Sequence, residues 1–169
     1  LMLIAALTAA AQSTTPPEPL QGIGIDDILN AQVPLDLAFH DETGRTVRLG
    51  EYFDGRRPVV LTLVYLKCPM LCTLVLNDTL RALRTLPLDL GRDFDVLTVS
   101  FNPREGPDLA GAKRRGYLEA YRRPGAESSW HFLTGDEAAI QQLTDCVGFR
   151  YRYDAKTDQF FHPAGIIVL

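Results

Sequence analysis

The chain has 169 residues, of which 46% are hydrophobic, and this is enough to build the core of one ordinary globular domain. A second domain is therefore not expected. The formal net charge of -4 gives no electrostatic reason to expect a nucleic-acid partner, and the sequence contains no zinc-finger or Walker pattern.

Residues 1–12 resemble the rear half of a secretory signal peptide, because an apolar run ends in the small residues Ala9-Ala10-Ala11. No basic segment precedes this run, so the sequence does not separate a cleaved signal peptide from the remnant of a membrane anchor. Residues 13–33 begin with a proline-rich stretch and are expected to form a linker. We expect an exported protein, in the periplasm or at the outer face of the cytoplasmic membrane, with a membrane tether as one alternative.

Residues 34–169 alternate between strand and helix patterns. A β-hairpin is predicted over residues 35–49, and the unbroken apolar runs 59–65 and 95–101 are typical of strands buried on both faces. Helices are predicted from Cys72 to Pro87, over 108–121 and over 136–147, with shorter strands at 131–133, 149–153 and 165–169. This order indicates one three-layer α/β domain around a parallel sheet, and we expect the domain to continue beyond its last strand.

The motif Cys68-Pro69-Met70-Leu71-Cys72 stands between a buried strand and a helix. The spacing places the second thiol one helical turn after the first, which suits two sulfurs that bind one ion. With Pro69 as the first helical residue and Cys68 as the N-cap, the helix dipole would favour the Cys68 thiolate. Cys72 would point inward and Cys68 outward. Buried small hydrophobes or a structural disulfide are the alternative, but a disulfide across so short a loop adds little stability.

Three histidines could complete a site with these thiols. His162 precedes the final strand and is the leading candidate, although its position alone does not show that it faces the cysteines. His40 on the hairpin and His131 at a strand entrance are expected to be ordinary exposed, packed or hydrogen-bonded histidines. Cys146, in a helical pattern with apolar neighbours, is expected to be buried and inert.

The ordered combination of motifs resembles the Sco/SenC family over about residues 34–169. It consists of the cysteine motif, Thr98-Val99-Ser100-Phe101-Asn102-Pro103-Arg104-Glu105, Phe132-Leu133-Thr134-Gly135 and His162. The resemblance implies a thioredoxin-like fold with an N-terminal β-hairpin extension. It also implies a tethered or exported copper protein that assists assembly of the copper centre of cytochrome c oxidase, with Cys68, Cys72 and His162 on the family's copper ligands.

The chain departs from the family pattern near the cysteines. Thr73 follows the second cysteine where the family often has proline, and only Met70 and Leu71 lie between the cysteines where an acidic residue is frequent. Asn102 replaces a frequent aspartate. These departures remove negative charge near the site, and we expect partner or redox preferences to differ accordingly.

Two thiolates and one imidazole form a soft ligand set that suits Cu(I) in a three-coordinate arrangement, with Cu(II) able to recruit an oxygen or solvent ligand. Structural zinc normally takes four protein ligands. We therefore predict a copper-binding assembly factor or metallochaperone. Its expected partner is the copper-bearing subunit of cytochrome c oxidase or another copper chaperone, and the sequence does not predict its oligomeric state.

Three other functions stay open at this point. In a thiol-disulfide oxidoreductase, Cys68 would attack and Cys72 would resolve, which would make them the catalytic residues of a protein that is not a classical enzyme. A peroxidase is disfavoured because Tyr65-Leu66-Lys67 lacks the Pro and Thr/Ser arrangement of peroxiredoxins. In a tethered binding module, the cysteines would be structural and the basic helix around Arg114 and Arg115 would dock the partner, although such charges usually coat a solvated face.

Overall fold

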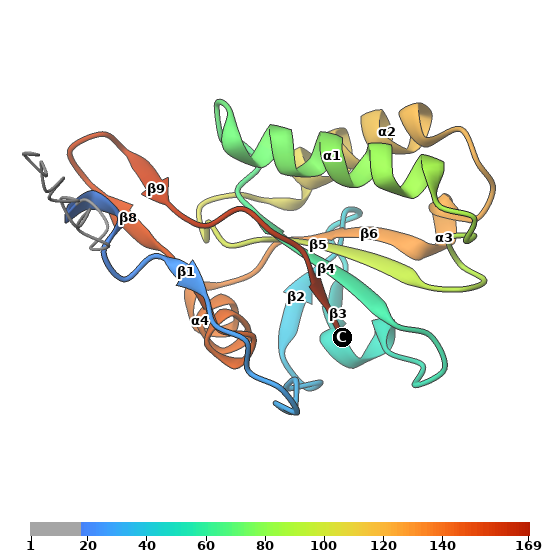
Figure 1. Ribbon diagram of the computed structural model, residues 1–169, viewed down its shortest axis with the longest axis horizontal. Coiled ribbons are helices and arrows are strands. Elements are labelled where there is room, and N and C mark those ends of the chain that lie inside the picture. The colour runs from blue at the N-terminus through green and yellow to red at the C-terminus, as the bar shows by residue number, and fades with distance from the viewer. Residues whose placement is uncertain (1–17) are drawn as a thin grey trace, which may run out of the picture.

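A four-stranded sheet forms the middle layer of the computed structural model, which describes residues 18–169 (Figure 1). The strand order is β10 (Ile167–Val168), β4 (Val59–Val64), β5 (Asp95–Ser100) and β6 (Trp130–Leu133). The last three strands are parallel, as predicted, and β10 pairs with β4 in the antiparallel direction. Because β4 and β5 are parallel neighbours, the loops that follow them leave the sheet at the same edge.

Helices α1 (Leu71–Thr85) and α2 (Pro107–Tyr121) cover one face of this sheet, while α4 (Glu137–Cys146) and a β-hairpin lie on the opposite side (Figure 1). The short helix α3 (Ala126–Ser129) leads into β6. The predicted cap of α4 is confirmed, since the Asp136 carboxylate accepts a backbone N–H at 2.8 Å. The fold is therefore the predicted thioredoxin-like α/β sandwich of three layers.

The remaining strands form pairs outside the central sheet. The predicted N-terminal hairpin is present as β2 (Ala38–His40) and β3 (Thr46–Arg48), followed by a 3-10 helix over Leu49–Tyr52. The single strand predicted over 149–153 is two strands, and a hairpin partner that the sequence did not indicate follows them. These elements are β7 (Phe149–Arg150), which pairs with β1 (Gly24–Ile25), and the hairpin β8 (Arg152–Asp154) with β9 (Gln159–Phe161).

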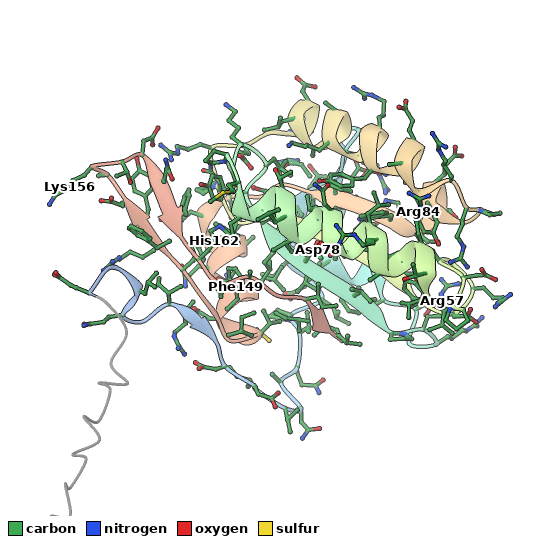
Figure 2. The ribbon with its side chains drawn as sticks, turned by 45° about the horizontal axis from the view of Figure 1, so that its top comes forward. Arg57, Asp78, Arg84, Phe149, Lys156 and His162 are labelled. Atoms are coloured by element: carbon green, nitrogen blue, oxygen red, sulfur yellow. The ribbon has the colours of Figure 1, made fainter. Side chains whose placement is uncertain are left out.

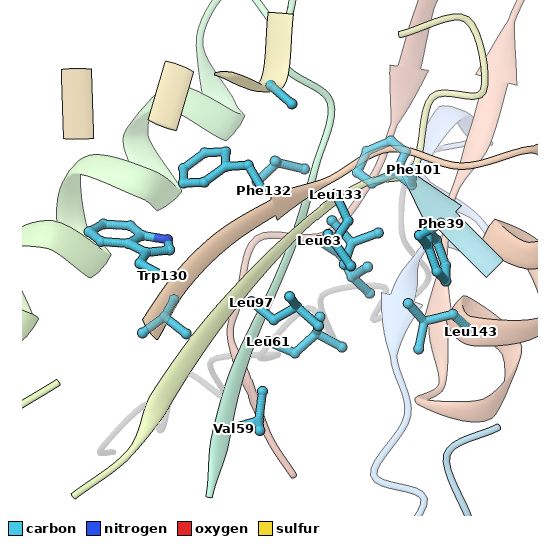
Figure 3. Packing of buried hydrophobic residues seen from close by; sticks show 14 of the residues in the cluster. Phe39, Val59, Leu61, Leu63, Leu97, Phe101, Trp130, Phe132, Leu133 and Leu143 are labelled. Atoms are coloured by element: carbon cyan, nitrogen blue, oxygen red, sulfur yellow. The ribbon is translucent and has the colours of Figure 1, made fainter. Parts of the chain in front are cut away.

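The central strands have no polar face because both sides of the sheet are covered. Toward α2, Trp130 and Phe132 pack against the ring of Tyr117. On the other side, apolar side chains of β4 and β5 pack with the hairpin and α4, as Figure 3 shows for Leu61, Leu97, Phe39 and Leu143. This two-sided burial explains why the runs in β4 and β5 lack polar alternation.

The predicted signal peptide or anchor, residues 1–12, lies outside the described residues. A short 3-10 helix, Glu18–Leu20, and β1 fall within the segment predicted as a linker. Within residues 18–169, none of the helices combines the length and apolar character needed to cross a membrane.

Candidate metal centre

The loop that carries the first cysteine differs from the sequence prediction. Helix α1 begins at Leu71 with Met70 as its N-cap, so Cys68 is not the cap and Pro69 is not the first helical residue. Instead, the Cys68 N–H donates to the Tyr65 carbonyl in a turn at 3.1 Å. Helical backbone angles are disfavoured for a residue that precedes proline, which agrees with the non-helical position of Cys68. The prediction that Cys68 points outward is also wrong, because only 8% of it is exposed.

The fold brings both cysteines and the late histidine together. The sulfur atoms of Cys68 and Cys72 and a ring nitrogen of His162 all lie within 4.8 Å of one another. The Cys72 Sγ and the His162 Nε2 are 3.4 Å apart. Figure 2 shows His162 between the β8–β9 hairpin and the first turn of α1, away from the hairpin tip at Lys156. All three side chains are buried, so the ligand atoms form a compact interior cluster.

His162 is oriented with a free lone pair toward the thiols. Its Nδ1 lies 2.9 Å from the Pro163 carbonyl oxygen, which only accepts, so Nδ1 carries the hydrogen and Nε2 is left as the ligand atom. The rings of Tyr65 and Phe101 pack at centroid distances of 5.6 and 5.2 Å. Burial lowers the pKa of His162, against a smaller opposing effect of the Pro163 hydrogen bond. The imidazole is therefore neutral at pH 7 and able to bind a metal.

Cys68 is the thiol that is activated. Burial alone would raise its pKa, but hydrogen bonds from the Cys72 and Met70 amides and from the Tyr65 phenol outweigh burial and lower it. The Cys72 N–H lies 3.3 Å from the Cys68 Sγ. The start of the helix thus stabilises the Cys68 thiolate, as expected. The Met70 and Cys72 amides do so although Cys68 lies before the helix and is not its N-cap.

Cys72 has the opposite character. Its burial raises the pKa of the thiol, and the nearby negative charges of Cys68 and Glu105 raise it further, despite a hydrogen bond from the Tyr65 N–H at 3.2 Å. A metal ion that binds here displaces the proton of Cys72, whereas Cys68 is already biased toward the thiolate. The two thiols therefore differ in how readily they lose their protons.

The comparisons with known proteins agree with this arrangement. The family model described as SCO1/SenC matches residues 28–169. The chain belongs to the SCO1/SenC family. None of the curated proteins matches it.

Solved structures of other family members share the fold of this SCO1/SenC chain. A SCO1/SenC family lipoprotein from Bacillus anthracis str. Ames has 14% sequence identity and a TM-score of 0.64, with 83% of this chain and 79% of that chain covered. ScoI from Bradyrhizobium japonicum, solved with copper bound, has 19% identity and a TM-score of 0.62, with coverage of 82% and 83%. BsSco, described as having a disulfide switch and as a member of the Sco family of cytochrome c oxidase assembly proteins, has 18% identity and a TM-score of 0.55, with coverage of 86% and 80%.

Sequence reasoning missed two residues that shape the site of this SCO1/SenC chain, Tyr65 and Glu105. The Glu105 carboxylate is buried and accepts the N–H groups of Leu66 and Lys67 at 2.6 and 2.8 Å. Glu105 lies in the loop after β5, which leaves the sheet at the same edge as the loop after β4, but its contacts span 39 and 38 positions of the chain and have no local sequence signal. The departures from the family pattern thus remove some negative charge but not all of it, since the Glu105 carboxylate lies against the loop that carries Cys68.

A groove opens beside the cysteine loop. It has a volume of about 440 Å³ and lies between the loop before α1, the loop after β5 and the turn of the β8–β9 hairpin. Its walls include Lys67, Pro69, Arg104 and Gln159. Lys67 and Pro69, the neighbours of Cys68 in the chain, therefore share this groove with side chains of two other segments.

The other candidate ligands lie elsewhere. His40 is exposed on the hairpin, and the His131 Nδ1 lies 3.1 Å from a Glu42 carboxylate oxygen. Neither joins the cysteine pair. Cys146 is only partly buried, contrary to prediction, and its Sγ lies 3.2 Å from the Gln32 carbonyl oxygen. It is the last residue of α4, three positions after the buried Leu143, so it lies at the border of the buried face of this helix.

Proposed function

We propose that this protein binds copper through Cys68, Cys72 and His162 and works as an assembly factor that delivers copper to the copper centre of cytochrome c oxidase. The observation that carries the proposal is the approach of the Cys72 Sγ to the His162 Nε2 at 3.4 Å, with the Cys68 sulfur in the same cluster. Membership of the SCO1/SenC family supports it, as do the copper-bound ScoI and the description of BsSco as an oxidase assembly protein.

The donor set fits copper. Two sulfurs and one neutral imidazole nitrogen match the preference of Cu(I) for soft ligands, and a Cu(II) ion takes an additional oxygen ligand. The hydrogen bond from the His162 Nδ1 to Pro163 fixes the tautomer that binds through Nε2. Copper is the cargo of this site, and protons that compete for the thiolates and the imidazole weaken its binding in acid.

Release of the cargo starts at Cys68. Cys68 lies in the loop outside the helix, between Lys67 and Pro69, two residues that line the groove, and it is 8% exposed against 2% for Cys72. A ligand of the partner replaces Cys68 first, while Cys72 and His162 still hold the ion. The partner is the copper-bearing subunit of the oxidase or another copper chaperone.

The site acts outside the cytoplasm in this proposal. The apolar residues 1–12 serve as a signal peptide or a membrane anchor and precede a linker and the thioredoxin-like domain from residue 34. Fractionation of cells that produce the protein tests this location, and recovery in the cytoplasmic fraction alone contradicts it.

Copper titration tests the assignment of the ligands. The variants Cys68→Ala, Cys72→Ala and His162→Ala are titrated with Cu(I) against a competing chelator, and each is expected to bind more weakly than the wild type. Cys146→Ala is the matched control, because this third cysteine lies outside the cluster and its removal leaves the affinity unchanged. X-ray absorption of the loaded wild type is expected to report sulfur and nitrogen coordination. Unchanged affinity in all three ligand variants contradicts the proposal.

A second candidate function is thiol-disulfide exchange, favoured by the lowered pKa of Cys68 beside a second thiol. The Cys68 thiolate attacks a disulfide of the partner, and Cys72 then attacks the mixed disulfide. The partner gains two thiols, and this protein forms a Cys68–Cys72 disulfide, so two electrons and two protons pass to the partner. His162→Ala separates the functions, because it abolishes high-affinity copper binding but leaves disulfide reduction intact if exchange is the main activity.

A further inference from the structure

Three successive backbone amides in the loop after β4 point at two acceptors. The Tyr65 N–H donates to the Cys72 Sγ at 3.2 Å. The next amide, that of Leu66, donates to the Glu105 Oε2 at 2.6 Å, and the one after it, that of Lys67, donates to the Glu105 Oε1 at 2.8 Å. The same short segment is therefore held by a ligand sulfur on one side and by a buried carboxylate on the other.

The carboxylate of Glu105 is itself held in place. Only 6% of the residue is exposed, and the Ser100 hydroxyl donates to its Oε2 at 2.6 Å. The Ser100 hydroxyl oxygen also accepts the Asn102 N–H at 3.2 Å. Both oxygens of Glu105 thus accept hydrogen bonds, and the end of β5 is tied through this side chain to the loop after β4.

This tie ends one residue before a metal ligand, because Cys68 directly follows Lys67. The Cys68 N–H closes a turn onto the Tyr65 carbonyl, so the position of its sulfur depends on the path of residues 65–67. Without an acceptor at Glu105, the buried amide of Leu66 and the partly buried amide of Lys67 lose their partner, which is costly away from solvent. The loop would then shift to hydrate them and carry the first thiol with it.

We propose that Glu105 is the positioning residue of the copper centre, holding the loop of Cys68 at the spacing at which both sulfurs reach one ion and placing a fixed negative charge beside it. The inference rests on the proposed function. It also accounts for the sequence of this chain, since the carboxylate that Asn102 lacks is supplied three residues later along the same loop. A fixed negative charge stabilises the more positive oxidised ion, so Glu105 lowers the Cu(II)/Cu(I) reduction potential.

Glu105→Gln keeps the shape of the side chain but removes its charge and replaces one acceptor by a donor. The matched control is Glu42→Gln, because Glu42 is also a carboxylate with a buried side chain that accepts a backbone N–H, that of Phe132 at 3.1 Å, but lies against His131 and Arg114. For Glu105→Gln we expect a loss of Cu(I) affinity of about 10- to 100-fold, the range typical of groups that orient metal ligands. We also expect a higher Cu(II)/Cu(I) reduction potential and faster hydrogen exchange at the Leu66 and Lys67 amides of the metal-free protein. Glu42→Gln should leave all three unchanged.

Equal losses of affinity in both variants would assign the effect to general destabilisation and overturn the proposal, as would wild-type affinity and potential in Glu105→Gln. If Glu105→Gln does not fold, Glu105→Asp retains the charge but shortens the reach, and it is expected to keep the potential while exposing the two amides to exchange. Wild-type exchange rates in Glu105→Asp would then overturn the positioning role. A wild-type protein that binds no copper contradicts the proposed function instead, and amide exchange in the metal-free variants still tests what Glu105 holds.

Discussion

Cys72 and His162 are separated by 90 residues along the chain, yet the Sγ of one lies 3.4 Å from the Nε2 of the other. The topology explains this approach. Strand β10 pairs with β4 in the antiparallel direction, with Ile167 opposite Leu61 and Val168 opposite Val60. The residues before β10 therefore run beside the residues after β4, which brings the His162 loop to the loop that carries the cysteines.

The unequal environments of the two thiols predict unequal reactivity. Iodoacetamide is expected to modify Cys68 faster than Cys72 in the reduced, metal-free protein, because amides and the Tyr65 phenol lower the pKa of Cys68 while burial raises that of Cys72. Peptide mapping by mass spectrometry at several pH values measures both rates, and Cys146 is followed separately. Equal rates for the two clustered cysteines, or faster modification of Cys72, would contradict this assignment.

Burial of His162 predicts a pH dependence of stability in the metal-free protein. Its pKa in the folded state lies below the ordinary value of 6.5, so the unfolded chain binds the extra proton more readily. The stabilisation is complete above about pH 6.5 and is lost as the pH falls through the lowered pKa. Urea denaturation from about pH 5 to pH 7 should show a steeper loss of unfolding free energy for the wild type than for His162→Gln. Parallel curves for the two proteins would show that His162 does not titrate as its burial requires.

The central elements of the fold could be predicted from the sequence because local patterns determine them. Strands β4 and β5 are buried on both faces and appear as unbroken apolar runs, and the helix begun at Asp136 has a cap that is visible in the sequence. The β8–β9 hairpin was not predicted. Its strands are three residues each and carry exposed and half-buried side chains, so no strong periodicity marks them.

The metal centre could be predicted in its members but not in its geometry. The spacing of Cys68 and Cys72 suggested one helical face, whereas Cys68 lies in a turn that precedes the helix. Long-range contacts determine the rest of the site geometry. The carboxylate of Glu105 reaches a loop 38 and 39 residues away, and such a contact leaves no local signal. A long-range contact also decides the role of Arg114 in the basic helix. Its ion pair with Glu42 leaves it little freedom to coat a solvated face.

The cap of α4 predicts a stability effect that leaves the metal centre untouched. Asp136→Ala removes the acceptor of the Ala139 N–H and is expected to lower the free energy of unfolding by about 1 kcal/mol. Urea denaturation measures this loss, and Cu(I) affinity should stay at the wild-type value. Asp136→Ser restores a capping acceptor and should recover most of the stability. A change in copper affinity in Asp136→Ala would show that α4 is coupled to the site.

Phe101 links the hydrophobic core to the metal centre, because its fully buried ring packs at 5.2 Å from the His162 ring and 5.7 Å from that of Tyr65. Phe101→Ala is expected to cost about 3–5 kcal/mol of unfolding free energy and to weaken Cu(I) binding, because the imidazole loses the surface that fixes its orientation.

Phe132→Ala is the control for this effect. Phe132 is equally buried but packs against Trp130 and Tyr117 under α2, so its loss should destabilise the fold by a similar amount and leave the copper affinity unchanged. Urea denaturation and Cu(I) titration are compared at a temperature at which both variants are folded, and Phe101→Leu replaces Phe101→Ala where the latter unfolds. A Phe101 variant that binds copper as tightly as the wild type would mean that the β9–β10 loop, with the hydrogen bond from the His162 Nδ1 to Pro163, orients the imidazole without help from the core.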